Sequence, residues 1–362
     1  MKKVLLVMGG LDAGGAEKWA LDFCNKLKEL SYSVDVLCHE NKPYFFEKEF
    51  KDLGVNIIKF SGHKNPIKYL NSINKLVKLN GYDVIHSHVN HFSSLICLSK
   101  FFHLKRIIVH CHNDLSVYKK NASFAKKLYY IASELIINRL ANERIAVSEI
   151  AAKSLFSPGY ELIYCGVNFN KLKEDVKVSQ IDESIRTSLT GKKNIFHVGR
   201  FVHQKNHEFI LSLAKESKRQ GYEFQFVLLG DGELFDFVKS RVVNEKIDNI
   251  LMLGAVHNVA ALLYEYAYLN ILPSHHEGLP ITLMECQALG VKSIVSSKVS
   301  HESSLSDDLV DFLDISNEEA KYEWLDKISL HSRESNVFNE NFINSKFDID
   351  RSALKVIALY EN

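Results

Sequence analysis

The stretch VLLVMGGLDAGGAEKWALDF, residues 4–23, gives the clearest signal of the fold. Its first five residues, Val4–Met8, form a short apolar run of the kind found in buried β-strands. Two pairs of glycines follow on either side of Asp12. From residue 16 to residue 30, apolar side chains then recur at the spacing of one helix face. The stretch therefore predicts a strand, a glycine-rich turn and a helix in direct succession.

The same alternation continues along both halves of the chain. Apolar runs of strand length recur at 34–38, 84–86, 107–109, 145–147, 194–198, 224–229, 250–253, 269–272 and 293–295. Helical patterns lie between them, at 70–79, 208–220, 259–266 and 280–289. Strands that alternate with helices predict an α/β fold whose parallel sheets are covered on both faces.

The length of 362 residues favours two domains. We expect an N-terminal Rossmann-like domain over residues 1–170 and a C-terminal one over residues 194–345. The segment 171–193 is polar and rich in charge, which predicts a linker with a surface helix. Residues 346–362 are expected to form a closing helix that packs back on the first domain.

The composition is that of an ordinary soluble globular protein, with 46% hydrophobic and 25% charged residues. The formal net charge of +1 selects no nucleic-acid partner. Six cysteines without a C-x-x-C pair indicate free thiols in a reducing compartment. The N-terminal apolar run is too short for a signal peptide, and no stretch reaches about 18 apolar residues. We therefore expect a cytoplasmic protein that is at most peripheral to the inner face of the plasma membrane.

The glycine loop at 9–17 is suited to an anion. Glycines let the backbone approach a ligand, and a helix N-terminus offers free N–H groups and the positive end of a dipole. The loop matches neither the dinucleotide fingerprint G-x-G-x-x-G nor the phosphate loop that ends in Gly-Lys-Ser/Thr. The alternative interpretation, that the glycine loop is a tight turn between strand and helix and binds no ligand, stays open.

A second loop, His197-Val198-Gly199-Arg200-Phe201, follows another predicted strand, and Lys205 lies five residues after Arg200. The planar fork of arginine matches phosphate oxygens, and lysine supplies a mobile point charge. The two cations suit a phosphate group, while solvated surface cations are the alternative.

The most specific pattern is PSHHEGLPITLME, residues 273–285, which follows an apolar strand. Glu277 and Glu285 are separated by seven residues, Gly278 permits a bend, and Pro280 suits a first helical turn. Backbone N–H groups near 281–283 would point at an anion, and the carboxylates can accept hydrogen bonds from sugar and ribose hydroxyls. One loop and helix can thus hold sugar, phosphate and ribose, and a capping acid with a surface glutamate is the alternative.

With its Glu277-x7-Glu285 pattern, the segment HEGLPITLMECQALG at 276–290 resembles the hallmark of retaining GT-B glycosyltransferases of glycosyltransferase family 4. Less specific motifs occur in the order and spacing of that family, at 14–17, 165–168, 199–205 and 230–232. The likeness covers nearly the whole chain. Residues 86–88 and 106–113 are most similar to enzymes of capsular and exopolysaccharide assembly.

The resemblance implies two Rossmann-like domains whose parallel sheets face each other across a cleft. It implies transfer of a hexose or N-acetylhexosamine from a nucleotide-sugar, a UDP-sugar, to a saccharide or lipid-linked saccharide in surface polysaccharide synthesis. Retention of anomeric configuration is expected. Since no carboxylate is clearly placed as a nucleophile, we expect a front-face displacement in which the leaving phosphate accepts the proton of the acceptor hydroxyl.

The resemblance also implies roles for individual residues. Arg200 and Lys205 would neutralise the diphosphate, Glu277 would bind hydroxyls of the donor hexose, and Glu285 would bind the ribose. His112 would lie beside the reacting sugar and orient it or donate a hydrogen bond. The other expected donor-binding positions are Gly14, Gly15, Asp231, Val256, Gly278, Leu279, Pro280, Ile281, Thr282 and Leu283. His276 departs from the family, which often has a bulky apolar or aromatic residue there, so the sugar contacts at this position stay open.

Neither a metal nor another cofactor is expected. Asp348-Ile349-Asp350 fits the Asp-x-Asp string of metal-dependent transferases but lies in the tail, far from the glycine-rich loops. Fixed cations and helix N-termini can stabilise the leaving phosphate instead. His86 and His88 share a strand face and can begin a metal site, but no carboxylate or cysteine completes an obvious set. Histidines that line a polar cleft are the alternative.

Other interpretations stay open. The segment 118–139 combines lysines with apolar residues, so it predicts either a helix on an anionic membrane or a helix with solvated lysines. A sugar-nucleotide epimerase or hydrolase of the same shape would need no acceptor. A nucleotide-binding oxidoreductase would need the dinucleotide fingerprint, which the first loop lacks. A non-catalytic sugar-nucleotide-binding protein is a further alternative.

Overall fold

The structure, a computed structural model, describes residues 2–102, 105–120, 122–332 and 336–361. The chain forms two compact units. Unit 1 comprises Met1–Gly166 and Ile349–Asn362, and unit 2 comprises Val167–Asp348. The chain therefore passes between the units twice.

Unit 1 is built on a seven-stranded parallel sheet of order β3-β2-β1-β4-β5-β6-β7. Its strands are β1 (Lys3–Met8), β2 (Ser33–Cys38), β3 (Asn56–Lys59), β4 (Val84–Ser87), β5 (Arg106–Cys111), β6 (Glu143–Ala146) and β7 (Glu161–Leu162). Its helices are α1 (Gly15–Glu29), α2 (Glu47–Asp52), α3 (Pro66–Asn80), α4 (Ser93–Leu98), α5 (Ser116–Lys120), α6 (Phe124–Leu140), α7 (Glu149–Leu155) and α15 (Ile349–Glu361).

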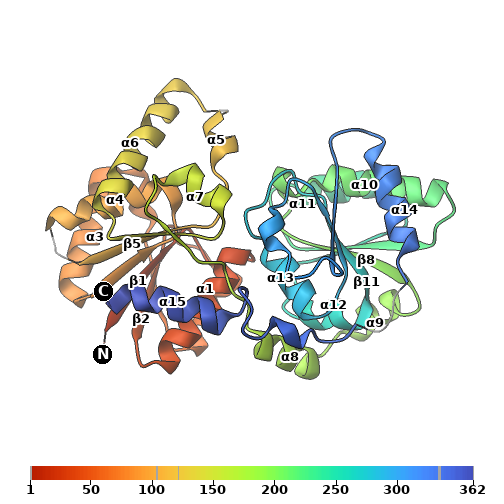
Figure 1. The fold of residues 1–362 in the computed structure, drawn as a ribbon, viewed down its shortest axis with the longest axis horizontal. Coiled ribbons are helices and arrows are strands. Elements are labelled where there is room, and N and C mark those ends of the chain that lie inside the picture. Colours follow the sequence, from red (N-terminus) through yellow and green to blue (C-terminus); the bar gives the residue numbers. More distant parts are fainter. Residues whose placement is uncertain (1, 103–104, 121, 333–335, 362) are drawn as a thin grey trace. The chain divides into compact units, whose positions relative to one another are not determined.

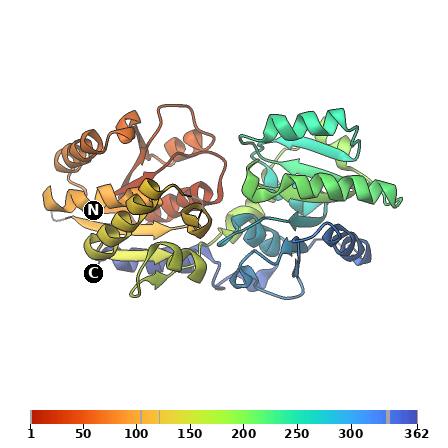
Figure 2. The ribbon, with the colours of Figure 1, turned by 90° about the horizontal axis from the view of Figure 1, so that it is seen from above.

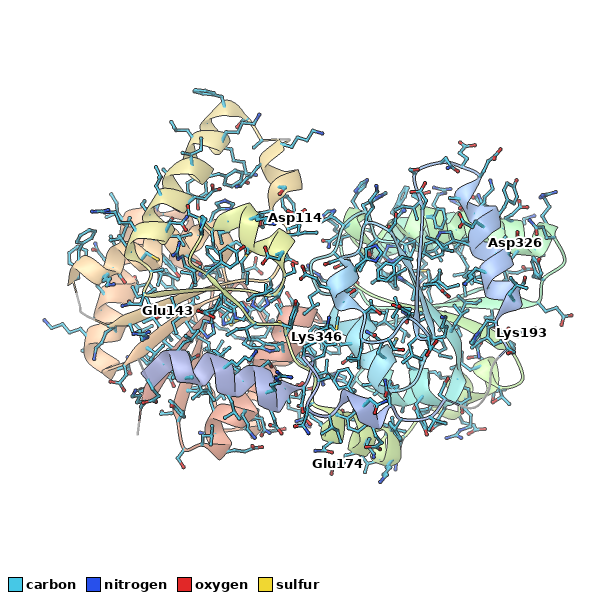
Figure 3. The ribbon with its side chains drawn as sticks, in the orientation of Figure 1. Asp114, Glu143, Glu174, Lys193, Asp326 and Lys346 are labelled. Atoms are coloured by element: carbon cyan, nitrogen blue, oxygen red, sulfur yellow. The ribbon has the colours of Figure 1, made fainter. Side chains whose placement is uncertain are left out.

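Helices cover both faces of this sheet. Figure 1 shows α3, α4 and α6 on one side of the strands and α1 and α15 on the other. Covered on both faces, a strand must be apolar along its whole length, and Val4–Val7 of β1 is fully buried. In Figure 3, Glu143 marks the amino end of β6 and Asp114 the segment just beyond the carboxyl end of β5.

Unit 2 contains a six-stranded parallel sheet of order β10-β9-β8-β11-β12-β13. Its strands are β8 (Lys193–Val198), β9 (Phe224–Leu229), β10 (Ile250–Gly254), β11 (Ala267–Leu272), β12 (Ser293–Ser296) and β13 (Val310–Leu313). Its helices are α8 (Phe169–Val178), α9 (Glu183–Leu189), α10 (His207–Arg219), α11 (Phe235–Asn244), α12 (Val259–Tyr266), α13 (Ile281–Ala288) and α14 (Ala320–Leu330). Figure 2 gives a second view of each unit, in which strands again lie between helices. The predicted α/β class with parallel sheets is confirmed in both units.

The structure gives more detail for two single segments. Residues 171–193, predicted as a linker with a surface helix, form most of α8 and all of α9, and α8 packs against α12 within unit 2. Residues 118–139 were predicted as one helix, but α5 ends at Lys120 and α6 begins at Phe124. The closing helix α15 begins at Ile349 and packs against α1 in unit 1. Within the described part of the chain, none of the helices has both the length and the apolar character needed to cross a bilayer.

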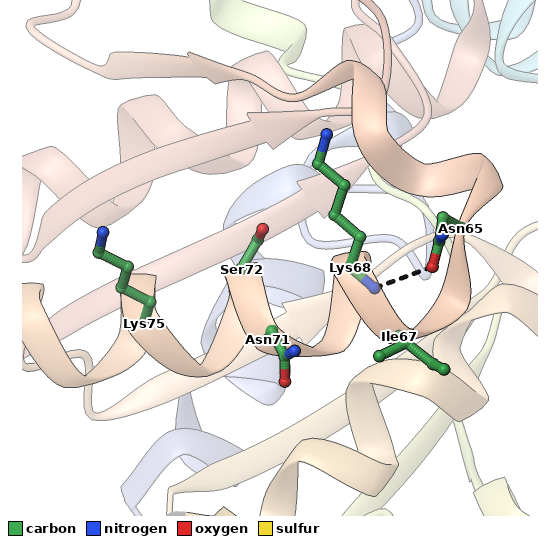
Figure 4. Close-up of a pocket in the computed structure, with 6 residues that line it drawn as sticks. All are labelled: Asn65, Ile67, Lys68, Asn71, Ser72 and Lys75. Carbon is green, nitrogen blue, oxygen red and sulfur yellow. Dashed lines mark hydrogen bonds between the residues drawn. The ribbon is translucent and has the colours of Figure 1, made fainter.

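A surface hollow of about 470 Å³ runs along α3 (Figure 4). It is lined by Asn65, Ile67, Lys68, Asn71, Ser72 and Lys75. None of the predicted site residues lines it.

Candidate active site

The predicted donor-binding residues of unit 2 follow the carboxyl ends of four neighbouring strands. Arg200 comes two residues after β8, Asp231 two after β9, and Val256 two after β10, while Glu277 lies in the segment that joins β11 to α13. Carboxyl ends of parallel strands lie at one edge of a sheet, and ligands bind where the strand order reverses. In unit 2 the order reverses between β8 and β11.

An ion pair joins the two loops at this reversal point. The Lys205 Nζ atom donates to the Glu277 Oε1 atom at 2.6 Å. The Glu277 side chain is 7% exposed and the Lys205 side chain 15% exposed. Lys205 follows β8 and Glu277 follows β11, so the pair spans the strand reversal. The two residues predicted to hold phosphate and sugar are thus in direct contact.

Two neighbours of Lys205 fix the loop that contains Glu277. Gln204 donates from Nε2 to the His276 carbonyl at 2.8 Å and accepts from the His275 N–H at 2.9 Å. Asn206 donates from Nδ2 to the Pro273 carbonyl at 3.1 Å. Sequence reasoning missed Gln204 and Asn206, because only the pairing of two distant loops reveals their role. They hold Glu277 in place as positioning residues.

Two glycines let the β8 and β9 loops approach each other closely. Gly230 has φ +131°, and a Cβ atom there would lie 2.1 Å from the Gly199 carbonyl oxygen. The Phe201 N–H donates to the Asp231 carbonyl at 2.9 Å. Only a residue without a side chain fits such an approach. The exposed side chain of Arg200 therefore lies in a loop adjoining that of Asp231.

The helix α13 starts directly after the Glu277 loop. Pro280 is its N-cap residue, and its carbonyl accepts from the Leu283 N–H at 3.0 Å. The first N–H groups of a helix have no acceptor within it, which leaves those of Ile281 and Thr282 suited to an anion. Gly278 and Leu279 complete the turn before the helix, and Glu285, half-buried, lies in its second turn. Their contact with a donor stays a prediction.

The glycine loop of unit 1 leads into the N-terminus of α1. Gly14 is the N-cap residue of α1 and Gly15 its first residue, at the carboxyl end of β1. A Cβ atom on Gly14 would lie 2.3 Å from the Glu17 Oε2 atom, so the Glu17 carboxylate folds back over the helix N-terminus. A carboxylate there is favoured by the helix dipole. Binding of a phosphate by Gly14 and Gly15 stays a prediction.

His112 follows β5 and is held by two neighbours. Its Nε2 atom lies 2.8 Å from His88 Nδ1, and its Nδ1 atom lies 3.6 Å from Cys165 Sγ. Burial lowers the pKa of His112 to about 4, so the imidazole is neutral near pH 7. A neutral ring can orient a sugar or donate one hydrogen bond, which fits the expected role better than that of a cationic acid.

Histidines of unit 1 also form a group that can hold a metal. The sequence indicated no carboxylate or cysteine that completes a set with His86 and His88. The structure adds His110 to that pair and groups Cys165 with His110 and His112. Pairing of β4 with β5 brings the histidines together, which local spacing does not encode. Asp348 and Asp350 lie in different units, and Asp350 pairs with Lys26 at 2.7 Å.

Two family models match the chain. The model described as Glycosyltransferase Family 4 matches residues 13–171, and the model described as Glycosyl transferases group 1 matches residues 180–330. A protein named glycosyltransferase EpsF from Bacillus subtilis (strain 168) is 26% identical over 87% of this chain and 84% of its own length. The capsular polysaccharide biosynthesis glycosyltransferase CapH of Staphylococcus aureus is 25% identical, with 84% of each chain covered.

Further similarity is found to an Escherichia coli enzyme and to a solved structure. The UDP-Gal:alpha-D-GlcNAc-diphosphoundecaprenol alpha-1,3-galactosyltransferase is 24% identical over 78% of this chain and 76% of its own. The crystal structure of Anabaena HepE in complex with UDP and glucose superposes with a TM-score of 0.80 at 14% identity, covering 99% of both chains. At that identity the likeness establishes the fold. Taken together, the strand order of both sheets, the two family models and the curated relatives identify the chain as a GT-B glycosyltransferase.

Proposed function

We propose that this protein is a retaining glycosyltransferase that moves a hexose or N-acetylhexosamine from a UDP-sugar to a saccharide or lipid-linked saccharide. The observation that supports it best is the Lys205–Glu277 pair, held at 2.6 Å at the strand reversal of unit 2 and followed by the N-terminus of α13. A cation, a carboxylate and free backbone N–H groups are the groups that a sugar diphosphate requires.

In this proposal, the Lys205–Glu277 pair binds both the diphosphate and the hexose of the donor. Lys205 and the exposed Arg200 neutralise the diphosphate as negative charge develops on it. Glu277 accepts hydrogen bonds from the hexose hydroxyls, and its ion pair with Lys205 orients the carboxylate before the donor arrives. Glu285 binds the ribose, and the first N–H groups of α13 bind phosphate. The transfer then needs no metal ion at the diphosphate.

Retention follows in this scheme from a front-face displacement. The bond from the anomeric carbon to the diphosphate oxygen breaks, and the acceptor oxygen bonds to the same face of that carbon. The proton of the acceptor hydroxyl passes to the departing phosphate oxygen. His112, neutral because of its burial, orients the sugar without taking the proton.

A lipid-linked acceptor is supported by two observations. The similar Escherichia coli enzyme is named for a diphosphoundecaprenol acceptor. In unit 1, α6 exposes apolar side chains together with lysines, among them Phe124, 86% exposed, and Leu135, 68% exposed, beside Lys126 and Lys127. Such a surface suits an anionic membrane on which the acceptor resides. Synthesis of a surface polysaccharide at the inner face of the plasma membrane fits the likeness to CapH.

A nucleotide-sugar screen tests the donor. The protein is melted with individual nucleotide-sugars in EDTA, and stabilisation by UDP and by one UDP-sugar is expected. The same UDP-sugar is then incubated with a lipid-linked saccharide, and the anomeric configuration of the product is read by NMR. Inversion would refute the retaining scheme, and conversion of donor without acceptor would indicate an epimerase or hydrolase. Sedimentation with anionic and neutral vesicles tests the membrane surface.

A further inference from the structure

Four histidines and a tryptophan form a largely buried cluster in unit 1 at the carboxyl ends of β4 and β5. Its members are His86, His88, His110, His112 and Trp19. Residues two apart share one strand face, so two strands paired in register bring four rings together. The ring centroids of His86 and His88 lie 4.2 Å apart, and those of His88 and His110 lie 5.3 Å apart.

Three rings of the cluster have ring nitrogens without a hydrogen-bond partner among the described residues. The Nδ1 atom of His86 lies 2.7 Å from the Tyr360 hydroxyl, and that of His88 lies 2.8 Å from His112 Nε2. Within the described part of the chain, the Nε2 atoms of His86 and His88 and both ring nitrogens of His110 have no hydrogen-bond partner. His86 and His110 are fully buried. Buried polar atoms without partners are rare and costly, on the order of 1–3 kcal/mol each.

This pattern is that of metal-binding histidines. A ligating imidazole uses one nitrogen for the metal and hydrogen-bonds through the other to an outer group. Here Tyr360 and His112 are those outer groups for His86 and His88.

We propose that His86, His88 and His110 form a three-histidine site for a divalent transition metal ion of the zinc type. One nitrogen from each ring lies within 4.8 Å of the others. Bonds of about 2.1 Å in a tetrahedral site place ligand nitrogens roughly 3.4 Å apart, which small ring rotations can reach. Three protein nitrogens leave the fourth position to water or a small ligand. Neutral imidazole is a ligand that zinc and its neighbours prefer over magnesium or calcium.

A second set of three, His110, His112 and Cys165, overlaps with the first. In it, His112 would bind through Nδ1, the atom that lies 3.6 Å from Cys165 Sγ. Among the described residues of the cluster, the ring nitrogens without partners belong to His86, His88 and His110, whereas His112 Nδ1 and Cys165 Sγ already contact each other. The three-histidine set therefore fits better, with His112 as its outer group. The ion would lie one hydrogen bond away from His112 and would fix the tautomer of that ring.

Trp19 provides a direct reporter of this site. Its ring centroid lies 5.0 Å from that of His110, and the only other tryptophan, Trp324, belongs to unit 2. Untagged protein is stripped of metal with a chelator, and Co²⁺ is added in the Trp324→Phe variant and in the unmodified chain. We expect saturable quenching of Trp19 fluorescence at one Co²⁺ per chain, with competition by Zn²⁺. These readouts do not depend on transferase activity.

Single substitutions identify the side chains that bind the metal ion. His110→Gln should weaken Co²⁺ binding at least 100-fold, and His88→Gln gives the same comparison if His110→Gln does not fold. His203→Gln is the matched control. The ring of His203 stacks on that of His275 in unit 2, with centroids 4.9 Å apart, and this surface pair of histidines could bind Co²⁺ in place of the proposed site. Cys165→Ser should bind Co²⁺ within a few-fold of the unmodified chain.

Three results would overturn the proposal. The first is the absence of saturable quenching up to millimolar Co²⁺ in the unmodified chain, which would mean that water fills the cluster. The second is quenching that survives His110→Gln and disappears with His203→Gln. The third is a 100-fold loss in Cys165→Ser, which would assign the ion to the set that contains the thiol.

Discussion

Replacing Glu277 by glutamine removes one charge of the Lys205–Glu277 pair and keeps the shape of the side chain. The two charged atoms lie 2.6 Å apart, and both side chains are largely buried. The substitution leaves the Lys205 ammonium in a poorly solvated place without its counterion. We therefore expect Glu277→Gln to destabilise unit 2 as well as to slow transfer.

The expected loss in unfolding free energy follows from the attraction between the two charges and the opposing cost of removing them from water. Coulomb's law at an effective dielectric constant of about 20 gives roughly 6 kcal/mol for 2.6 Å, and desolvation of both ions offsets most of it. Removing one partner of a fully buried pair costs about 3–5 kcal/mol, and exposed pairs contribute about 0–1 kcal/mol. With side chains 7% and 15% exposed, we expect a loss of about 2 kcal/mol in the free energy of unfolding.

Unit 2 has its own reporter for this measurement, since Trp324 is buried there and Trp19 lies in unit 1. Urea unfolding is followed by Trp324 fluorescence in a Trp19→Phe background. The Lys205→Met and Glu277→Gln variants and their combination complete a double-mutant cycle. The exposed pair Lys218–Asp248 is the control, and Asp248→Asn should leave the urea midpoint nearly unchanged.

The reasoning is refuted if Glu277→Gln and Asp248→Asn shift the midpoint equally, or if the coupling energy of the cycle is under about 0.5 kcal/mol. Either result would mean that Lys205 and Glu277 do not pair in solution. In transfer assays, Lys205→Met should lower kcat on the order of 100-fold, as loss of one electrostatic donor does. An unchanged kcat would remove Lys205 from the reaction.

Three other predictions follow from single features. Gly230→Ala should destabilise unit 2 by about 1–3 kcal/mol in urea, because its Cβ would strike the Gly199 carbonyl at 2.1 Å and its φ is +131°; an unchanged midpoint would contradict that loop geometry. Arg200→Ala should slow transfer about 100-fold without moving the urea midpoint, since Arg200 is exposed; equal losses of both would assign it a structural role. The folded-state pKa values of His86 and His112, about 3 and 4, lie below the unfolded value of 6.5, so their stabilisation is complete above pH 6.5 and is lost as pH falls. In unfolding followed by Trp19 fluorescence, about 1–2 kcal/mol of unfolding free energy per histidine should be lost between pH 6.5 and 5. An unfolding free energy that does not change over this pH range would contradict the burial of both histidines as neutral rings.

Much of the architecture can be predicted from local patterns. The run Val4–Met8 predicts a strand, because five consecutive apolar residues before a glycine turn suit a sheet covered on both faces. Within 171–193 one surface helix was predicted, and the structure has most of α8 and all of α9 there, with α8 packed against α12. The bounds of such short helices depend on tertiary packing, which the local pattern does not specify. The break between α5 and α6 was missed, since the periodic pattern runs on through 118–139.

By itself the sequence determined the two parallel α/β units and the positions of Glu277 and Glu285 relative to a strand and a helix, because strand and helix periods and turn residues act over a few neighbours. Only the tertiary structure decided that Lys205 meets Glu277, 72 residues away, and that His86 meets Tyr360, 274 residues away. Such contacts depend on strand order and on which helix closes the unit. These are set by packing of the whole sheet, which no local pattern specifies.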